Sequence, residues 1–319
     1  MKIVFYNLAH LGDIYFSQPL IKKFCIFNPN TDISAFLLSS WFLYKDINNL
    51  KLLGTSHNEY SPKWNGFSRL ESNIYNEEYL QQYNFFHNDF SKNKSFFKQD
   101  DTIYINTWFG ECHGHVPLCD LYALDNIFGD VICNINKAFN INLNYEKSLH
   151  LSITLPQCNI DNFLTFKNDK KVIFYYNFAP MSGQQQQLNH NIHEQIISFL
   201  SNTYTNYYIC CAIKPNYKNN NIVSVEDFGH IQTPCCKNVS ETVMIAMNCD
   251  YVFSFDVGAC FYYFNDKIND IFKGIWYHVS TDNEFYNKIN KYLNNENIRF
   301  ICINNYNELS NIITKKIAS

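Results

Sequence analysis

Short apolar runs alternate with segments of helical spacing along the whole chain, and this alternation restricts the fold more than any other feature. Strands that are separated by helices pair in parallel through right-handed crossovers. The runs that read as strands are residues 2–6, 32–38, 102–108, 171–176, 207–212, 222–225, 251–255, 274–277 and 299–303. The segments that read as helices are residues 14–27, 121–141, 191–200, 240–247, 283–293 and 308–317.

The spacing of these elements predicts two α/β domains. We expect two Rossmann-like doubly wound domains, residues 1–150 and 151–319, that face a cleft. Residues 55–100 show no regular period and predict short helices with long loops, and residues 142–170 read as the connection. The helix over residues 14–27 is expected to be amphipathic. Asn191 is a candidate N-cap, with Glu194 at the capping-box position.

Composition narrows the class of protein. The 319 residues suit two domains, and 46% hydrophobic residues are enough for two cores. The net charge of −4 argues against general nucleic-acid binding. The 12 cysteines follow no framework spacing and are expected to be reduced core thiols in a cytoplasmic protein. Neither a secretory leader nor an apolar run of about 18 residues is visible, so we expect no transmembrane segment.

The loop NLAHLGD, residues 7–13, joins the first strand to the first helix. Gly12 allows a close approach of the backbone, and Asp13 stands where the helix should start. Asp13 can be read as the N-cap of that helix, or as a carboxylate that takes a proton from an attacking hydroxyl. The two roles are compatible with each other.

Residues 2–24, KIVFYNLAHLGDIYFSQPLIKKF, resemble the opening of the lipopolysaccharide heptosyltransferases (ADP-heptose transferases), which are GT-B glycosyltransferases. In this family a strand is followed by a loop ending in Gly-Asp and by a helix with Pro six residues after the Asp. Gly12, Asp13 and Pro19 have that spacing. The resemblance implies that Asp13 is the catalytic base, that Gly12 lies at the donor, and that His10 lies at the acceptor.

Two loops of the second half resemble the donor loops of the same family. In the loop before residue 191, Ser182, Gly183, His190 and His193 stand where donor-binding groups are expected, although no Lys or Arg occurs between Lys171 and Lys214. The helix N-terminus that follows suits a phosphate group. A polar surface loop is the alternative interpretation.

The second donor loop is SFDVGACFYYFN, residues 254–265. Asp256 and Gly258 match the family pattern and, with Val257 and Ala259, are the expected donor contacts. Val257 replaces the hydroxyl residue of the family, and Phe261 stands where a His is usual. These departures leave open whether activity is retained.

The loop GECHGHVPLCD, residues 110–120, follows the strand at residues 102–108. Its spacing fits no common zinc finger or ribbon, so a metal is not expected. Trp108, His113 and His115 are candidate acceptor contacts through stacking and hydrogen bonds. An aromatic corner with ordinary loop histidines is the alternative.

The sequence therefore predicts an inverting glycosyltransferase without a metal or other cofactor. A nucleotide-sugar would be the donor, and a glycan, a lipid-linked molecule or a protein would supply the acceptor hydroxyl. Two alternatives stay open. One is a binding or scaffold protein of this fold without catalysis, and the other is an epimerase or phosphorylase acting on sugar nucleotides or sugar phosphates.

Overall fold

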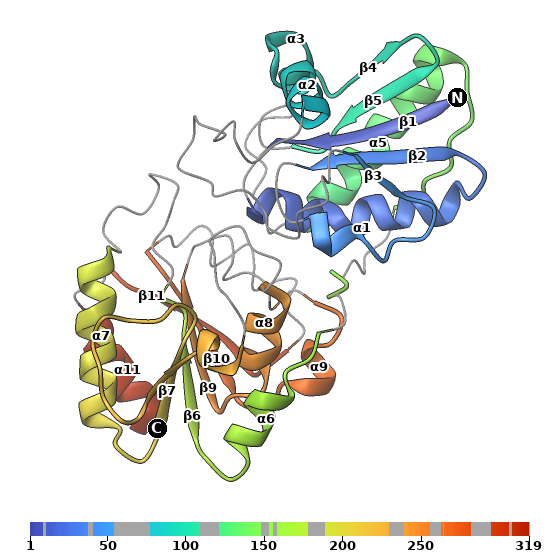
Figure 1. Ribbon diagram of the computed structural model, residues 1–319. Coiled ribbons are helices and arrows are strands. Elements are labelled where there is room, and N and C mark those ends of the chain that lie inside the picture. The colour runs from blue at the N-terminus through green and yellow to red at the C-terminus, as the bar shows by residue number, and fades with distance from the viewer. Residues whose placement is uncertain are drawn as a thin grey trace. The chain divides into compact units, whose positions relative to one another are not determined.

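The computed structural model divides into two compact units, Met1–Pro156 and Gln157–Ser319, and each unit contains its own sheet (Figure 1). The residues that the structure describes are 1–8, 11–37, 41–53, 77–108, 121–147, 153–155, 158–177, 189–229, 239–255, 263, 265–281, 295–305 and 308–318.

The first unit contains a sheet in the order β3-β2-β1-β5-β4, in which only β4 is antiparallel to its neighbour. Its strands are β1 (Lys2–Asn7), β2 (Asp32–Leu37), β3 (Lys51–Leu53), β4 (Phe96–Gln99) and β5 (Thr102–Asn106).

Strand β4 lies in a segment that was predicted to be irregular, and that prediction is wrong for these residues. β4 and β5 form a tight hairpin, in which Gln99 pairs with Thr102 and Asp100 adopts a positive φ of 52°. Asp tolerates this left-handed backbone conformation better than most residues. The acidic pair Asp100 and Asp101 was therefore a turn signal between two short strands.

The helices of the first unit cover both faces of its sheet. They are α1 (Leu11–Phe27), the 3-10 turn η1 (Trp41–Tyr44), α2 (Glu77–His87), the short α3 (Asp89–Lys92) and α5 (Leu121–Phe139). Successive residues of β1 point to opposite faces, as a strand requires. Phe5 packs on Phe24 of α1 and Phe128 of α5, whereas Tyr6 stacks on Phe86 of α2 with ring centroids 4.7 Å apart.

Helix α1 is not amphipathic, contrary to the sequence prediction. Residues 14–21 are all buried. The reason is that α1 is covered on more than one side, by β1, α5 and η1. Even Gln18 is buried, because its side-chain amide bonds to Leu43 of η1 and to Thr154.

The second unit has an all-parallel sheet in the order β11-β10-β9-β6-β7-β8. Its strands are β6 (Val172–Tyr175), β7 (Tyr208–Cys211), β8 (Ile222–Ser224), β9 (Tyr251–Phe255), β10 (Ile275–Ser280) and β11 (Ile298–Cys302). Its helices are α6 (Asp161–Lys167), α7 (His190–Thr203), η3 (Val225–Phe228), α8 (Val239–Met247), α9 (Ile268–Ile271) and α11 (Leu309–Ala318).

Aromatic residues also line both faces of this sheet. On one face Tyr175 meets His193 of α7, and on the other Tyr176 stacks on Trp276 with ring centroids 5.9 Å apart. Figure 1 shows α7 and α11 on one side of the strands and α8 and α9 on the other. Helix α6 was not predicted, and the predicted helix at residues 283–293 lies outside the described residues.

The prediction of an α/β chain with two Rossmann-like doubly wound units is confirmed by these strand orders. The cleft stays a prediction.

The cysteines that the structure describes are all free thiols. Within the described residues, no helix has both the length and the apolar character that a bilayer crossing demands.

Candidate functional site

The strand order of each sheet indicates where a ligand would bind. In a doubly wound sheet, ligands bind beyond the carboxyl ends of the strands. The site is at the switch point, where the connections that follow two neighbouring strands run to opposite sides of the sheet. In the second unit, β7 and β8 lie on one side of β6, and β9, β10 and β11 lie on the other. The switch point is therefore between β6 and β9, and the loops that follow these two strands are the predicted donor loops.

The described residues around this switch point are polar and well connected. Asn177, two residues after β6, donates through Nδ2 to the Ile213 carbonyl and accepts from the Ile213 N–H through Oδ1, both at 2.8 Å. Residue Ile213 follows β7, so this reciprocal pair fastens the two loops together. The sequence interpretation missed Asn177, although an Asn directly after a buried strand was a visible signal.

Helix α7 begins one residue before its predicted position. Asn189 is the N-cap, and its side-chain oxygen accepts the Ile192 N–H at 3.1 Å. The prediction of Asn191 as the cap with Glu194 in a capping box is therefore wrong. Glu194 instead accepts the N–H groups of Asn216 and Tyr217, at 2.9 and 2.8 Å. It holds the segment after β7 against α7.

The two predicted donor-site histidines of α7 have different surroundings. His190 lies in the first turn with 58% of its side chain exposed, and its Nε2 is 2.9 Å from Asn216 Nδ2 and 3.5 Å from Glu194. His193 is 1% exposed, with Nδ1 3.0 Å from the Tyr175 hydroxyl and its ring against Phe255. His190 is open to solvent, whereas His193 packs α7 onto β6 and β9. A donor contact by either residue stays a prediction.

The first unit has its switch point between β1 and β5, because β2 lies on one side of β1 and β5 on the other. Asn7 at the end of β1 donates to the carbonyl and hydroxyl oxygens of Thr107, at 3.1 and 3.3 Å. Both residues are buried. The pair ties together the two strand ends that lead into the first loop and into the residues 110–120 loop, and the sequence interpretation missed it.

Gly12 and Asp13 lie in the first turn of α1, which begins at Leu11 directly after the loop that follows β1. The backbone of both residues belongs to the described helix, whereas the side chain of Asp13 lies outside what the structure describes. The backbone placement brings Asp13 to the carboxyl edge of the first sheet, beside the β1–β5 switch point. Because α1 begins at Leu11, Asp13 lies inside the helix, and the interpretation of Asp13 as its N-cap is wrong. An acid in the first helical turn is nevertheless favoured by the helix dipole.

Trp108 lies just beyond β5 and is partly exposed. Its backbone N–H donates to Asn106 Oδ1 at 2.9 Å, and Lys92 Nζ lies 5.9 Å from the centroid of the Trp108 ring. An acceptor contact by Trp108 stays a prediction. The other predicted site residues lie outside the described part of the chain, and they are His10, His113, His115, Ser182, Gly183, Asp256, Val257, Gly258 and Ala259.

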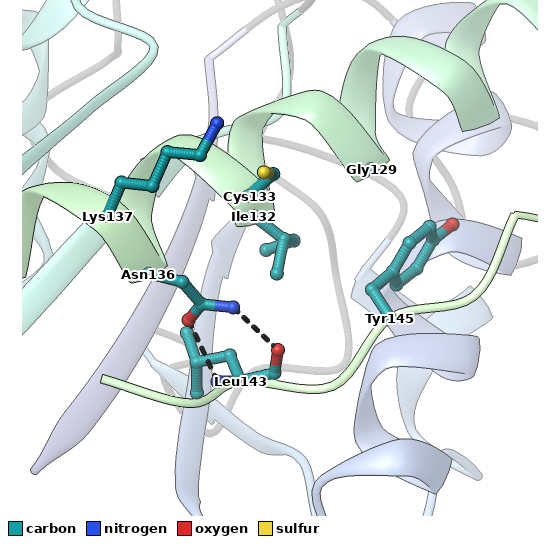
Figure 2. Close-up of a pocket in the computed structure, with 7 residues that line it drawn as sticks. All are labelled: Gly129, Ile132, Cys133, Asn136, Lys137, Leu143 and Tyr145. Atoms are coloured by element: carbon teal, nitrogen blue, oxygen red, sulfur yellow. Dashed lines mark hydrogen bonds between the residues drawn. The ribbon is translucent and has the colours of Figure 1, made fainter. Parts of the chain in front are cut away.

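A separate open cavity of about 360 Å³ lies along α5. Figure 2 shows its lining, which comes from α5 and from the segment after it: Gly129, Ile132, Cys133, Asn136, Lys137, Leu143 and Tyr145. Asn136 closes one side by donating to, and accepting from, the Leu143 backbone, both at 2.8 Å. Phe139, which ends α5, meets Lys98 opposite the start of β5, so this cavity lies toward the amino ends of the strands.

In the part of the chain that the structure describes, no group of three or more His, Cys, Asp or Glu side chains could hold a metal ion. The cluster at residues 110–120 lies outside that part.

No family model and no curated protein matches this chain. Solved structures similar to it include a glycosyl transferase family 9 protein from Veillonella parvula (12% identity, TM-score 0.47, covering 98% of this chain and 89% of that one). A second is E. coli heptosyltransferase WaaC with ADP-2-deoxy-2-fluoro heptose (10% identity, TM-score 0.45, covering 100% of this chain and 99% of that one). A third is E. coli ADP-heptose lps heptosyltransferase II (11% identity, TM-score 0.43, covering 99% of this chain and 98% of that one). Identities this low do not carry a residue's role from one protein to another.

Proposed function

We propose that this protein is an inverting glycosyltransferase that moves a sugar from a nucleotide-sugar to an acceptor hydroxyl without a metal. The observation that carries the proposal is the backbone position of Gly12 and Asp13 in the first turn of α1, directly after the central strand β1. A carboxylate there stands at the ligand-binding edge of a doubly wound sheet. The resemblance of residues 2–24 to heptosyltransferases supports the same role.

The proposed reaction needs one base and one place for the leaving group. The Asp13 carboxylate takes the proton from the acceptor hydroxyl. The acceptor oxygen then forms a bond to the anomeric carbon, while the bond from that carbon to the diphosphate oxygen breaks. The nucleoside diphosphate leaves with the electron pair. Attack from the face opposite the leaving group inverts the anomeric configuration.

The second unit would hold the diphosphate. The amino end of α7 offers N–H groups and the positive end of a helix dipole next to the β6–β9 switch point. With no Lys or Arg between Lys171 and Lys214, the charge of the leaving group would be stabilised by these backbone groups and by polar side chains such as His190. The loop at Asp256 and Gly258 would supply the remaining contacts.

A binding protein without catalysis is the second candidate. Val257 and Phe261, and the missing cation before α7, favour it because they remove groups expected at a donor diphosphate. An epimerase or phosphorylase of the same fold would differ from a transferase in its products.

The test is a thermal-shift panel of nucleotides and nucleotide-sugars with and without EDTA, followed by product analysis with each stabilising donor. ADP and ADP-sugars come first because the resemblance points to them. A ligand at a thousand times its dissociation constant stabilises by about 4 kcal/mol. A shift that EDTA does not change, with transfer of the sugar, supports the proposal. Binding without any turnover supports the second candidate, and loss of transfer in EDTA contradicts a metal-independent reaction.

A further inference from the structure

Helix α1 contains Pro19, and this residue weakens the connection between the first turns of the helix and the rest. Proline has no N–H, so the Tyr15 carbonyl receives no bond from residue 19, and the ring crowds that carbonyl. Residues 11–18, which include Gly12 and Asp13, therefore need contacts from outside the helix to hold their position.

Tyr44 of η1 supplies such a contact one residue after Asp13, as part of a triangle of oxygen atoms. The hydroxyls of Ser17 and Tyr44 both reach the Ile14 carbonyl, that of Ser17 at 2.9 Å, and the two hydroxyl oxygens lie 2.7 Å apart. All three residues are buried. Two hydroxyl hydrogens serve three contacts, so each hydroxyl can donate to the carbonyl or to its neighbour.

Gln18 reinforces the same connection from the adjacent position. Its Nε2 donates to the Leu43 carbonyl at 2.8 Å and to the Thr154 carbonyl at 2.7 Å, and its Oε1 accepts the Thr154 N–H at 3.0 Å. Leu43 and Tyr44 both belong to η1. Leu43 and Tyr44 therefore form hydrogen bonds with Gln18 and Ile14, which lie in successive turns of α1 on the amino-terminal side of Pro19.

We propose that Tyr44 is a positioning residue, whose hydroxyl fixes the first turn of α1 and thereby the place of Asp13 relative to the acceptor. This inference rests on the proposed function, because it gives the anchored turn its role in transfer. Burial raises the pKa of Tyr44 far above the usual value for tyrosine, so its hydroxyl keeps the hydrogen that this anchoring role needs across the working pH range. Misplacement of a base affects turnover more than it affects donor binding.

The test compares Tyr44→Phe with Tyr6→Phe. Tyr6 is a matched control in the same unit, because it is also buried and its hydroxyl also donates to a carbonyl, that of Ser91. Tyr44→Phe should lower kcat about ten-fold while the KM for the nucleotide-sugar stays within about two-fold. Amide hydrogen exchange of residues 15–18, whose N–H groups bond to the carbonyls of residues 11–14, should become about ten-fold faster. Tyr6→Phe should change neither quantity.

A second pair keeps the test decisive if Tyr44→Phe folds poorly. Ser17→Ala should reproduce both effects in part, and Ser17→Thr, which keeps the hydroxyl, should restore them. Exchange and kcat equal to those of the Tyr6→Phe control would overturn the inference. If the wild-type protein transfers no sugar, the proposed function fails separately, and exchange alone then decides whether Tyr44 anchors the turn.

Discussion

The Ser254 hydroxyl oxygen lies 3.1 Å from Nδ1 of His278, its register partner on the neighbouring strand β10. The same oxygen accepts the Trp276 indole N–H at 2.7 Å, and all three side chains are fully buried. Because an indole can only donate, the Ser254 oxygen accepts from Trp276, and the hydroxyl keeps a hydrogen and a second lone pair for its contact with His278. One hydroxyl therefore serves two ring nitrogens in the core of the second unit.

Ser254→Ala should lower the free energy of unfolding of the second unit by about 2 to 3 kcal/mol, because it removes the acceptor of Trp276 and one partner of His278. Denaturant unfolding followed by tryptophan fluorescence measures it. Ser34→Ala is the matched control: Ser34 is also a fully buried strand serine, and its hydroxyl has no hydrogen-bond partner within the described part of the chain. That variant should leave the unfolding free energy of the first unit, to which Ser34 belongs, within about 0.5 kcal/mol of the wild type, because it removes no hydrogen bond. Equal losses in both would contradict the assignment.

Two glycines should respond in opposite ways to alanine. A Cβ at Gly274 would overlap the carbonyl oxygens of both Cys249 and Asp250, which are backbone atoms that cannot move aside cheaply. Gly274→Ala should therefore cost about 1 to 3 kcal/mol or more in unfolding free energy.

At Gly129 the three heavy atoms nearest to the added Cβ all belong to the side chain of Lys147, whose Cε would lie 2.6 Å away and whose far end is flexible. Gly129→Ala should leave stability unchanged or raise it by up to about 1 kcal/mol through helix propensity, because the position is inside α5. Thermal unfolding of both variants checks this contrast, and a Gly129→Ala loss as large as that of Gly274→Ala would refute it.

Asp125 of α5 holds three parts of the first unit together. Its Oδ1 accepts the Tyr145 hydroxyl and lies 3.4 Å from Lys23 Nζ, which also lies 4.8 Å above the Tyr145 ring. The carboxylate is 1% exposed. Asp125→Ala should cost about 3 to 5 kcal/mol, because it leaves a largely buried ammonium without its counter-charge.

The double variant Lys23→Met with Asp125→Leu tests whether the cost comes from the unpaired charge. Removing both charges together should recover at least half of the loss seen in Asp125→Ala, as measured by urea unfolding. If the double variant is as unstable as the sum of the two single variants, the ion pair is not the cause.

The sequence predicted those elements that can be recognised from their own residues, and it missed those that depend on partners far away in the chain. Strand β9 was predicted at its observed residues, because an apolar run bounded by polar residues needs no distant partner to be recognised. Strand β4 was missed, since four residues with two phenylalanines between Ser95 and Lys98 read as irregular until β5 pairs with them. The burial of Gln18 was equally hidden, because its partners Leu43 and Thr154 are far away in sequence.

The candidate site divides in the same way. The Gly12–Asp13 turn was visible as a local motif, and its position after β1 follows from the order of elements alone. Asn7 with Thr107, and Asn177 with Ile213, join loops that are remote in sequence, so a local pattern could mark the asparagine after a buried strand but not its partner. The N-cap of α7 was misplaced by two residues because Asn189 and Asn191 are equally good caps in isolation.

Stability should fall in alkali through Cys25. Burial raises the pKa of this thiol in α1 to about 12, above its ordinary value of 9.0. A raised pKa contributes stability that is complete below about pH 9 and is lost as the pH rises toward 12. Between pH 9 and 10.5 the loss from this thiol should reach about 2 kcal/mol. Cys25→Ala should unfold with a shallower pH dependence, whereas Cys133→Ala, at an exposed thiol, should keep the wild-type slope.

The most direct test of the central claim is sugar transfer by Asp13→Asn, measured with the donor that stabilises the wild-type protein. Removing the base while keeping the size of the side chain should lower kcat by about 100-fold or more, with donor affinity within about two-fold of the wild type. Asp13→Glu, which keeps a carboxylate in a shifted position, should retain part of the activity. Transfer at the wild-type rate by Asp13→Asn would contradict the account, because a side-chain amide cannot accept the proton.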